Sequence, residues 1–166
     1  MDSRTILAEI PRLRRYARAL LGDRAAADDL VQDTLERAWF RFHQWRAGSD
    51  LRAWLFGIMH NLRVDQLRRP VLSTDSIDAD DFELSTRPTQ TDEREVRDLE
   101  SALRLLPDEQ REVLLLVALE EMSYADIAAA QGIPIGTVMS RLSRGREGLR
   151  KIMDGQLPAT RLKLVR

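Results

Sequence analysis

Cysteine is absent from the 166-residue sequence, and histidine occurs only at His43 and His60. The first absence excludes disulfide bonds, thiolate metal sites and a cysteine nucleophile. With two histidines a histidine-rich metal site is not expected, and we predict neither a metal nor another cofactor. Neither histidine has a recognisable partner in the sequence, so we interpret both as surface or capping residues.

Long apolar runs are also absent. The longest one, from Val113 to Leu119, is far shorter than the roughly 20 residues that span a bilayer. The first 16 residues lack the apolar segment of a secretory signal. We therefore expect a cytoplasmic protein with no membrane span of its own. Apolar residues still make up 43% of the chain, which is enough to form a folded core.

Charge is strongly segregated along the chain, although the net charge is only −1. Residues 1–70 contain 13 arginines and 9 acidic residues, residues 71–95 contain 2 arginines and 8 acidic residues, and basic residues gather again after position 140. Only Lys151 and Lys163 of the 26 basic residues are lysine. The pattern favours basic faces that bind a polyanion, and arginine suits phosphates and base edges, although a GC-rich genome gives the same bias.

Apolar periodicity predicts an all-α fold of two small helical domains joined by a flexible acidic linker. Helices are expected over residues 3–21, 24–44 and 50–69, and then from about 93, over 107–121, from 124, and from 134 to about 153. Gly22, Asp23, Pro70 and Gly132 mark helix ends or starts. The domains are predicted as residues 1–70 and 93–154, with the linker at 71–92 and a frayed tail at 155–166.

Residues 123–152 contain the most specific motif, SYADIAAAQGIPIGTVMSRLSRGREGLRKI. A short capped helix, a glycine-containing turn and an arginine-rich helix are the parts of a helix-turn-helix, whose second helix enters the major groove of DNA. The free N–H groups of Gly136 and Thr137 at the start of that helix suit a phosphate. An ordinary helical hairpin with a solvated basic face is the alternative. The predicted packing face comprises Ile127, Ile133, Val138, Leu142, Leu149 and Ile152.

Aromatic residues alternate with arginines near the end of the second predicted helix. Such a pattern suits single-stranded nucleic acid, because bases stack on rings while guanidinium groups bind phosphates. The alternative is that the rings form the core of a small domain, and we interpret Trp39 and Trp54 in this way. The cluster comprises Trp39, Phe40, Phe42, Trp45, Trp54 and Phe56 with Arg37, Arg41 and Arg46.

Acidic residues form one face of the same predicted helix, because Asp29, Asp33 and Glu36 are spaced i, i+4, i+7. No second acidic cluster or histidine is positioned to complete a metal site with them. We therefore interpret this face as solvated or as a partner-binding surface.

Three segments, in order, resemble the extracytoplasmic-function (ECF, group IV) family of bacterial RNA polymerase sigma factors. RYARALLGDRAAADDLVQDTLERAW is similar to the start of sigma domain 2, and DLRAWLFGIMHNLRVDQLRR to its promoter-reading end. LPDEQREVLLLVALEEMSYADIAAAQGIPIGTVMSRLSRGRE is similar to sigma domain 4. The resemblance covers nearly the whole of residues 7–153. It implies a promoter-recognition protein that is not an enzyme and has three kinds of partner: core RNA polymerase, promoter DNA and an anti-sigma factor.

The resemblance also implies which residues bind these partners. The second helix would dock on the clamp helices of the largest polymerase subunit, and the chain would also contact the flap. The acidic linker would thread the RNA-exit region as an anionic mimic of the transcript, or serve only as a soluble tether. The implied polymerase-binding residues are Asp28, Asp29, Gln32, Asp33 and Glu36.

The DNA contacts implied by the resemblance fall into two groups. The −10 element would be bound by a loop and the helix after it, and the −35 element by the last helix. Met139 stands where an arginine is frequent in the family, and Ser143 where a larger residue is frequent, so the −35 sequence does not carry over from relatives. The implied residues are Trp45, Arg46, Ser49, Asn61, Arg63, Asp65, Arg68 and Arg69 for the −10 element, and Thr137, Met139, Ser140, Arg141, Ser143, Arg144 and Arg146 for the −35 element.

Three other functions remain open at this point. A polymerase-independent helix-turn-helix regulator would explain residues 123–153 but leaves the aromatic cluster and the acidic face without a role. A helical prenyl synthase would use an acidic DDxxD motif, whereas the chain has DDLVQD and no second acidic motif. A module that mimics a sigma factor to occupy its inhibitor should have degenerate basic reading helices, and these are intact.

The predicted linker leads to a first testable outcome. Limited proteolysis of the free chain should cut between Val71 and Asp92 and leave two helical fragments, because this segment has little apolar surface to bury. Mass spectrometry of the fragments locates the cut. A chain that resists cleavage there without any partner would contradict the predicted linker.

Overall fold

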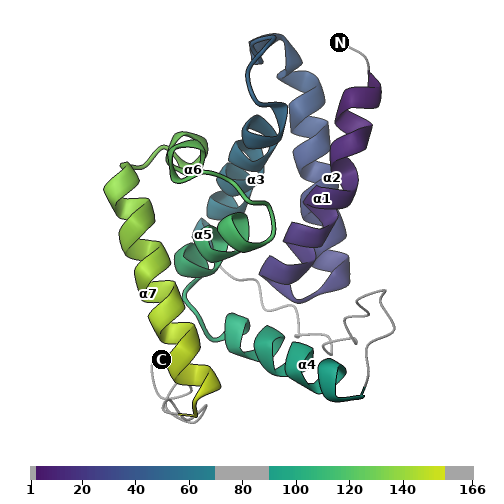
Figure 1. The fold of residues 1–166 in the computed structure, drawn as a ribbon. Coiled ribbons are helices and arrows are strands. Elements are labelled where there is room, and N and C mark those ends of the chain that lie inside the picture. The colour runs from purple at the N-terminus through teal and green to yellow at the C-terminus, as the bar shows by residue number, and fades with distance from the viewer. Residues whose placement is uncertain (1–2, 70–89, 156–166) are drawn as a thin grey trace.

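The computed structural model describes residues 3–69 and 90–155, and all of the regular structure within these ranges is helical (Figure 1). The all-α prediction is therefore confirmed. Most of the predicted acidic linker and nearly all of the predicted tail lie outside the described residues, and with them the proposed contact of the linker with the RNA-exit region. The elements are α1 (Ser3–Leu21), α2 (Arg24–Phe40), the 3₁₀ turn η1 (Phe42–Gln44), α3 (Leu51–Arg68), α4 (Gln90–Arg104), α5 (Asp108–Ala118), α6 (Tyr124–Gln131) and α7 (Ile135–Met153).

The first three helices begin and end where local chemistry requires it. Gly22 ends α1 with a positive φ of 67°, which glycine adopts at little cost. Asp23 caps α2 by accepting the N–H of Ala25 at 2.9 Å, and Asp50 caps α3 in the same way. Pro11 lies inside α1, and the helix continues through it.

Two predicted helix ends are wrong. The second helix was expected to reach residue 44, but α2 ends at Phe40 and the chain tightens into η1, so that Phe42 packs against Trp54 with ring centroids 6.4 Å apart. The helix expected to end near Glu121 ends at Ala118. Glu121 has a positive φ of 51°, and the N–H of Met122 turns back to the Leu116 carbonyl at 3.1 Å.

The last two helices form the expected helix-turn-helix. The Ser123 side chain accepts the N–H of Asp126 at 3.0 Å and caps α6. Gly132 ends α6 in the left-handed conformation, with a φ of 66°. The predicted packing face is confirmed, since Ile127, Val138 and Leu142 are buried and Ile133, Leu149 and Ile152 pack against them.

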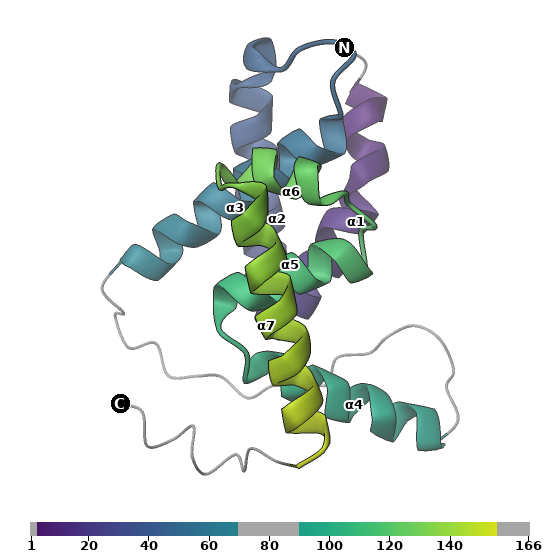
Figure 2. The same cartoon turned by 60° about the vertical axis from the view of Figure 1, so that its left-hand side comes forward.

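The first three helices and the last four pack against each other in the described chain. Helix α3 contacts α6, and α1 contacts both α5 and α4 (Figure 2). Gly57 permits the close approach of α3 and α6, because a Cβ atom at this position would lie 3.1 Å from the backbone oxygen of Ala130. One continuous core of buried side chains therefore extends across both halves.

Tyr16 of α1 lies at the centre of this shared core. Its side chain is 3% exposed and meets the ring of Phe56 edge to face, with centroids 5.0 Å apart. Burial raises the pKa of the Tyr16 phenol well above 10.0, and the nearby carboxylates of Glu112, Asp108 and Glu120 raise it further. Because those carboxylates belong to the second half, contact between the two halves favours the neutral phenol.

This raised pKa predicts a loss of stability at alkaline pH. The Tyr16 phenol binds its proton more tightly in the folded chain than in the unfolded chain. Its contribution to the free energy of unfolding is therefore fully present below pH about 10 and is lost as the pH rises above that value. The loss is at most about 1.4 kcal/mol per pH unit. The free energy of unfolding in urea should therefore fall more steeply above pH about 10 in the wild-type chain than in Tyr16→Phe.

The matched control is Tyr124→Phe, which removes the other tyrosine of the sequence from a half-buried position at the start of α6. Its stability should follow the wild-type pH dependence. Parallel curves for wild type and Tyr16→Phe would show that Tyr16 is not held neutral by the fold.

Candidate nucleic-acid interface

Helix α7 turns its buried side toward α5 and α6 and leaves a basic side exposed. Val138, Leu142 and Gly145 are its buried residues. The predicted reading residues Met139, Ser140, Ser143, Arg144 and Arg146 are all exposed. The structure therefore brings these five side chains onto the outer surface of the helix-turn-helix.

Two other predicted residues of α7 are engaged within the protein. Arg141 pairs with Glu109 of α5 at 3.2 Å, so its guanidinium is directed toward α5. Thr137 is half-buried, and its N–H donates to the Pro134 carbonyl at 3.0 Å. The expectation that the Thr137 N–H is free for a phosphate is therefore wrong, because the first turn of the helix uses it.

The exposed side of α3 and its C-terminal end contain four of the eight predicted −10 residues. Asn61, Asp65, Arg68 and Arg69 are exposed, and Asp65 lies 3.9 Å from Arg37 of α2. Arg63 differs from them. Its side chain is 19% exposed and pairs with Asp108 of α5 at 2.9 Å, so it is not available to a phosphate in this conformation.

In the loop before α3, exposed polar residues surround the packed indole ring of Trp45. Trp45 is half-buried against Phe42, with ring centroids 5.6 Å apart, and its buried Nε1 has no hydrogen-bond partner. Arg46 and Ser49 are exposed, and the Ser49 hydroxyl donates to the Arg46 carbonyl at 2.6 Å. This hydrogen bond uses only the backbone carbonyl of Arg46, so the Arg46 guanidinium stays in solvent.

Trp39 is not a core residue, so the structural interpretation of this side chain is wrong. It is 66% exposed, and the adjacent Phe40 is 71% exposed. The buried side of α2 includes Ala38, and Trp39 lies about 100° further around the helix. Trp54, by contrast, packs against the core as expected.

The predicted partner-binding face of α2 is exposed throughout. A hollow of about 590 Å³ lies beside it, between α1 and α2, and Arg14 forms its α1 side. Asp28 lies 3.6 Å from Arg18 of α1, which holds part of this edge in place. The exposed side chains of the face are those of Asp28, Asp29, Gln32, Asp33 and Glu36.

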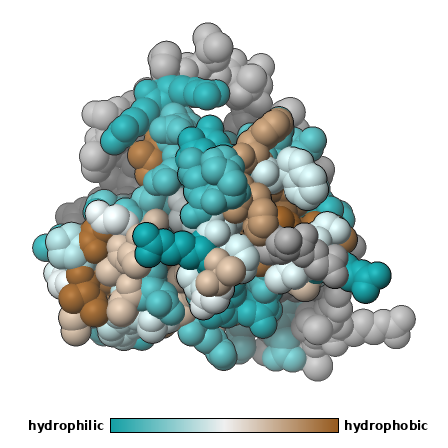
Figure 3. Space-filling view, turned by 90° about the horizontal axis from the view of Figure 1, so that it is seen from above, coloured by the Kyte–Doolittle hydropathy of each residue, from teal (hydrophilic) through white to brown (hydrophobic). Residues whose placement is uncertain are grey.

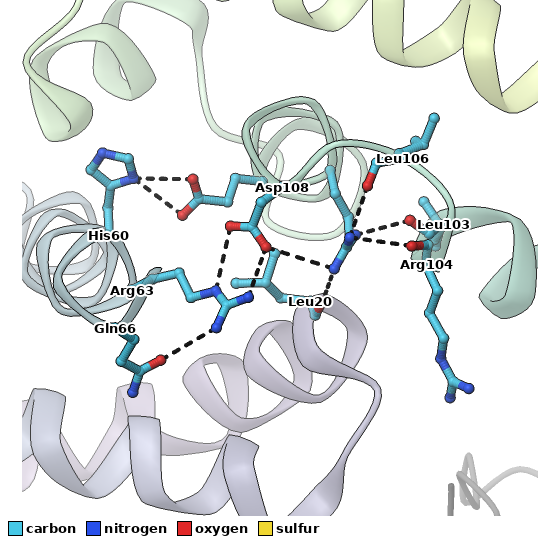
Figure 4. A network of polar contacts seen from close by, with 10 residues as sticks. Leu20, His60, Arg63, Gln66, Leu103, Arg104, Leu106 and Asp108 are labelled. Atoms are coloured by element: carbon cyan, nitrogen blue, oxygen red, sulfur yellow. Dashed lines mark hydrogen bonds and ion pairs between the residues drawn. The ribbon is translucent and has the colours of Figure 1, made fainter. Parts of the chain in front are cut away.

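A polar network that was not predicted joins α3 to α5 (Figure 4). Arg63 forms a bidentate ion pair with Asp108, and His60 Nδ1 lies 3.1 Å from Glu112 Oε1. The interpretation of His60 as a surface or capping residue is therefore wrong. Sequence spacing could not reveal these pairs, because their members lie 45 and 52 positions apart.

Arg111 of α5 binds the ends of two other helices in the same network. Its guanidinium donates to the Leu20 carbonyl at 2.7 Å, near the end of α1, and to the Leu103 and Leu106 carbonyls at 2.9 and 2.8 Å, around the end of α4. A cation at a helix C-terminus satisfies orphan carbonyls and interacts favourably with the helix dipole. Burial lowers the pKa of Arg111, whereas the neighbouring Asp108 raises it.

A second polar connection lies at the end of α5. Arg15 of α1 contacts the buried Glu120 carboxylate at 3.2 Å and the Leu119 carbonyl at 3.0 Å. Arg52 of α3 donates to the Glu120 carbonyl at 2.9 Å. We call the contacts of His60, Arg63, Arg111 and these two arginines across the two halves the polar seam.

Neither a metal cluster nor a membrane helix is found in the part of the chain that the structure describes. Within residues 3–69 and 90–155, no group of three or more acidic or histidine side chains is arranged to hold a metal ion. No helix in these ranges is long and apolar enough to cross a membrane.

Comparison with known families gives a match to each half of the chain. The family model for the Sigma2 domain of PhyR matches residues 6–60, and the family model for Sigma-70, region 4, matches residues 97–149. The second match includes α5, α6 and most of α7.

Two curated relatives cover most of the chain. The ECF RNA polymerase sigma factor EcfG of Rhodopseudomonas palustris is 41% identical over 89% of this chain and 82% of its own length. The ECF RNA polymerase sigma factor SigE of Mycolicibacterium smegmatis is 34% identical over 84% of this chain and 56% of its own length.

Solved structures agree in fold. The sigma factor RpoE of Bartonella quintana, in complex with the anti-sigma factor NepR, is 35% identical and superposes with a TM-score of 0.73 over 98% of this chain and 97% of its own. CnrH, in complex with the cytosolic domain of CnrY, is 26% identical with a TM-score of 0.68, over 93% of this chain and 88% of its own. The two matched regions and the extent of these similarities establish that the chain belongs to the ECF RNA polymerase sigma factors.

Proposed function

We propose that the chain binds core RNA polymerase and directs it to a specific class of promoters. The observation that carries this proposal is the exposed basic side of α7, within a region 4 helix-turn-helix, in the same chain as a sigma domain 2 fold. The polymerase performs the chemistry of transcription, and the chain contributes recognition.

The acidic face of α2 is our candidate for the polymerase contact. Its carboxylates would face a basic, partly polar surface on the clamp helices of the largest subunit, and charge complementarity would set the orientation of docking. The exposed rings of Trp39 and Phe40 lie at the C-terminal end of the same helix and would add apolar area to the contact. Region 4 would bind the flap.

Promoter DNA would be contacted on two separate surfaces. The Trp45–Ser49 loop and α3 would bind the −10 element, where the Asn61 amide can pair with adenine and the Asp65 carboxylate can accept from cytosine. Arg68 and Arg69 would hold phosphates beside it. The exposed side of α7 would read the −35 element in the major groove.

The closed arrangement is too small to read both elements at once. A compact chain of this length has a radius of gyration of about 15 Å and so a diameter of about 40 Å. The −10 and −35 elements lie about 25 base pairs apart, or about 85 Å along the duplex. The two halves would therefore separate on the promoter, and separation would break the Arg63–Asp108 pair and release Arg63 to a phosphate.

An anti-sigma factor would control this step by holding the chain closed. The fold similarity is to a sigma factor in complex with NepR and to CnrH in complex with CnrY. A partner that spans both halves would stabilise the polar seam, because it binds the closed form and not the separated one.

Two other functions make different predictions. A polymerase-independent regulator would bind its DNA tightly without polymerase. A sigma-factor mimic is favoured by one observation, the match of residues 6–60 to the Sigma2 domain of PhyR, which is called an anti-anti-sigma factor in its complex with NepR. A mimic would bind an anti-sigma factor but would not support initiation with core polymerase.

The acidic face predicts that the double substitution Asp29→Arg with Asp33→Arg abolishes polymerase binding. Reversing two charges places arginines against a basic surface, so affinity for core polymerase should fall more than tenfold, and run-off transcription should fall with it. Fluorescence anisotropy of labelled chain gives the affinity, and circular dichroism shows whether the helices persist.

The matched control is Glu95→Arg with Asp98→Arg, which reverses two exposed charges on one side of α4. This variant should bind core polymerase as the wild type does. Unchanged affinity in the α2 variant would exclude that face as the polymerase contact, whereas a wild-type chain that never supports initiation would exclude the proposed function.

A further inference from the structure

Small residues line the outer face of the first half of α7. Gly136, Ser140 and Ser143 are spaced i, i+4, i+7 and are all exposed, opposite the buried Val138 and Leu142. Among the residues that the structure describes, none beyond the adjacent turns of α7 comes within 4 Å of a Cβ atom built on Gly136. Because these side chains are short, the helix axis can approach base edges closely in a major groove about 12 Å wide.

The side chains on the two sides of this line of small residues differ in polarity. At 100° per residue, Thr137 and Arg144 lie on one flank, and Ile135 and Met139 lie on the other. Met139 is 52% exposed and Ile135 is 49% exposed. In the first half of α7 the helix therefore presents Arg144 on one side of the line and two neighbouring apolar side chains on the other. The exposed Arg146 lies on the Met139 side, two turns further along the helix.

The apolar pair lies on a strongly basic helix. Five of the residues in α7 are basic and one, Glu147, is acidic, and Glu147 is paired with Arg150 at 2.6 Å. Apolar surface gathers at the left-hand edge of the view in Figure 3, where Figure 1 shows the α6–α7 turn. The charge of the surrounding surface selects a polyanion as the occupant of this face rather than an apolar protein partner.

Thymine is the base that an exposed apolar side chain can recognise in the major groove. Its C5-methyl group projects there, and apolar contact with this group is how proteins read it directly. Serine contacts any base and arginine prefers guanine, so neither Ser140 nor Arg144 supplies this discrimination.

We propose that Met139, supported by Ile135, is a specificity-determining residue that contacts the C5-methyl group of a thymine in the −35 element. The inference rests on the proposed function, since it needs α7 in the major groove of promoter DNA. A T·A base pair is therefore expected where Met139 faces the −35 element, and a guanine is expected where Arg144 faces it.

The test removes a single methyl group from the DNA. Holoenzyme reconstituted from core polymerase and the full chain first selects promoters from a library randomised across the −35 element. Each thymine of the selected element is then replaced by deoxyuridine. Wild-type initiation should fall about fourfold at one thymine, which is the factor expected for the loss of one buried methyl group.

Variants identify the side chain that contacts this methyl group. With Met139→Ala, deoxyuridine at that thymine should have no further effect, because the apolar contact is already absent. Met153→Ala is the matched control, since Met153 is 47% exposed at the far end of the same helix. This variant should retain the fourfold loss.

Several results would overturn the inference while leaving the proposed function intact. They are an equal deoxyuridine effect in wild type and Met139→Ala, no effect at any thymine, and a selected element made only of G·C pairs. If the wild-type holoenzyme initiated at no library member, the proposed function itself would fail, and the inference would fail with it.

Discussion

The ion pair between Arg63 and Asp108, together with the guanidinium of Arg111 beside it, is the interaction on which this arrangement of the chain depends. Asp108 lies 2.9 Å from Arg63 of α3 and 3.8 Å from Arg111, which itself binds carbonyls near the ends of α1 and α4. One carboxylate and one guanidinium therefore link four helices from both halves. Both side chains of the Arg63–Asp108 pair are 19% exposed, and Asp108 keeps Arg111 as a second partner, so removing Arg63 should cost less than the roughly 3–5 kcal/mol of a fully buried pair.

The polar seam includes Arg63, a residue that the family resemblance assigns to promoter DNA. In the proposed function, Arg63 would leave Asp108 when it binds a phosphate of the promoter. Promoter binding would then compete with the closed conformation, and polymerase would supply the binding energy that separates the halves. A partly buried ion pair suits such a switch, because its net contribution to stability is small while its geometry is specific.

Local chemistry determined what could be predicted from the sequence. Capping residues such as Asp23 and Ser123 gave helix starts correctly, and the apolar period gave the buried side of α7. The errors came from contacts between distant segments. His60 and Arg63 have partners on α5, and Phe42 in η1 packs against Trp54 of α3. Trp39 shows that a large apolar residue in a periodic pattern can still lie outside the core.

A distance between the two halves tests the central claim most directly. The sequence has no cysteine, so Thr5→Cys on α1 and Ser101→Cys on α4, both exposed, give two specific sites for spin labels. The free chain should show one short distance, within the roughly 40 Å of a compact molecule. The complex with core polymerase and promoter DNA should show a distance longer by tens of ångströms, as expected for two halves bound to elements about 85 Å apart. An unchanged distance in an initiating complex would contradict the opening of the polar seam.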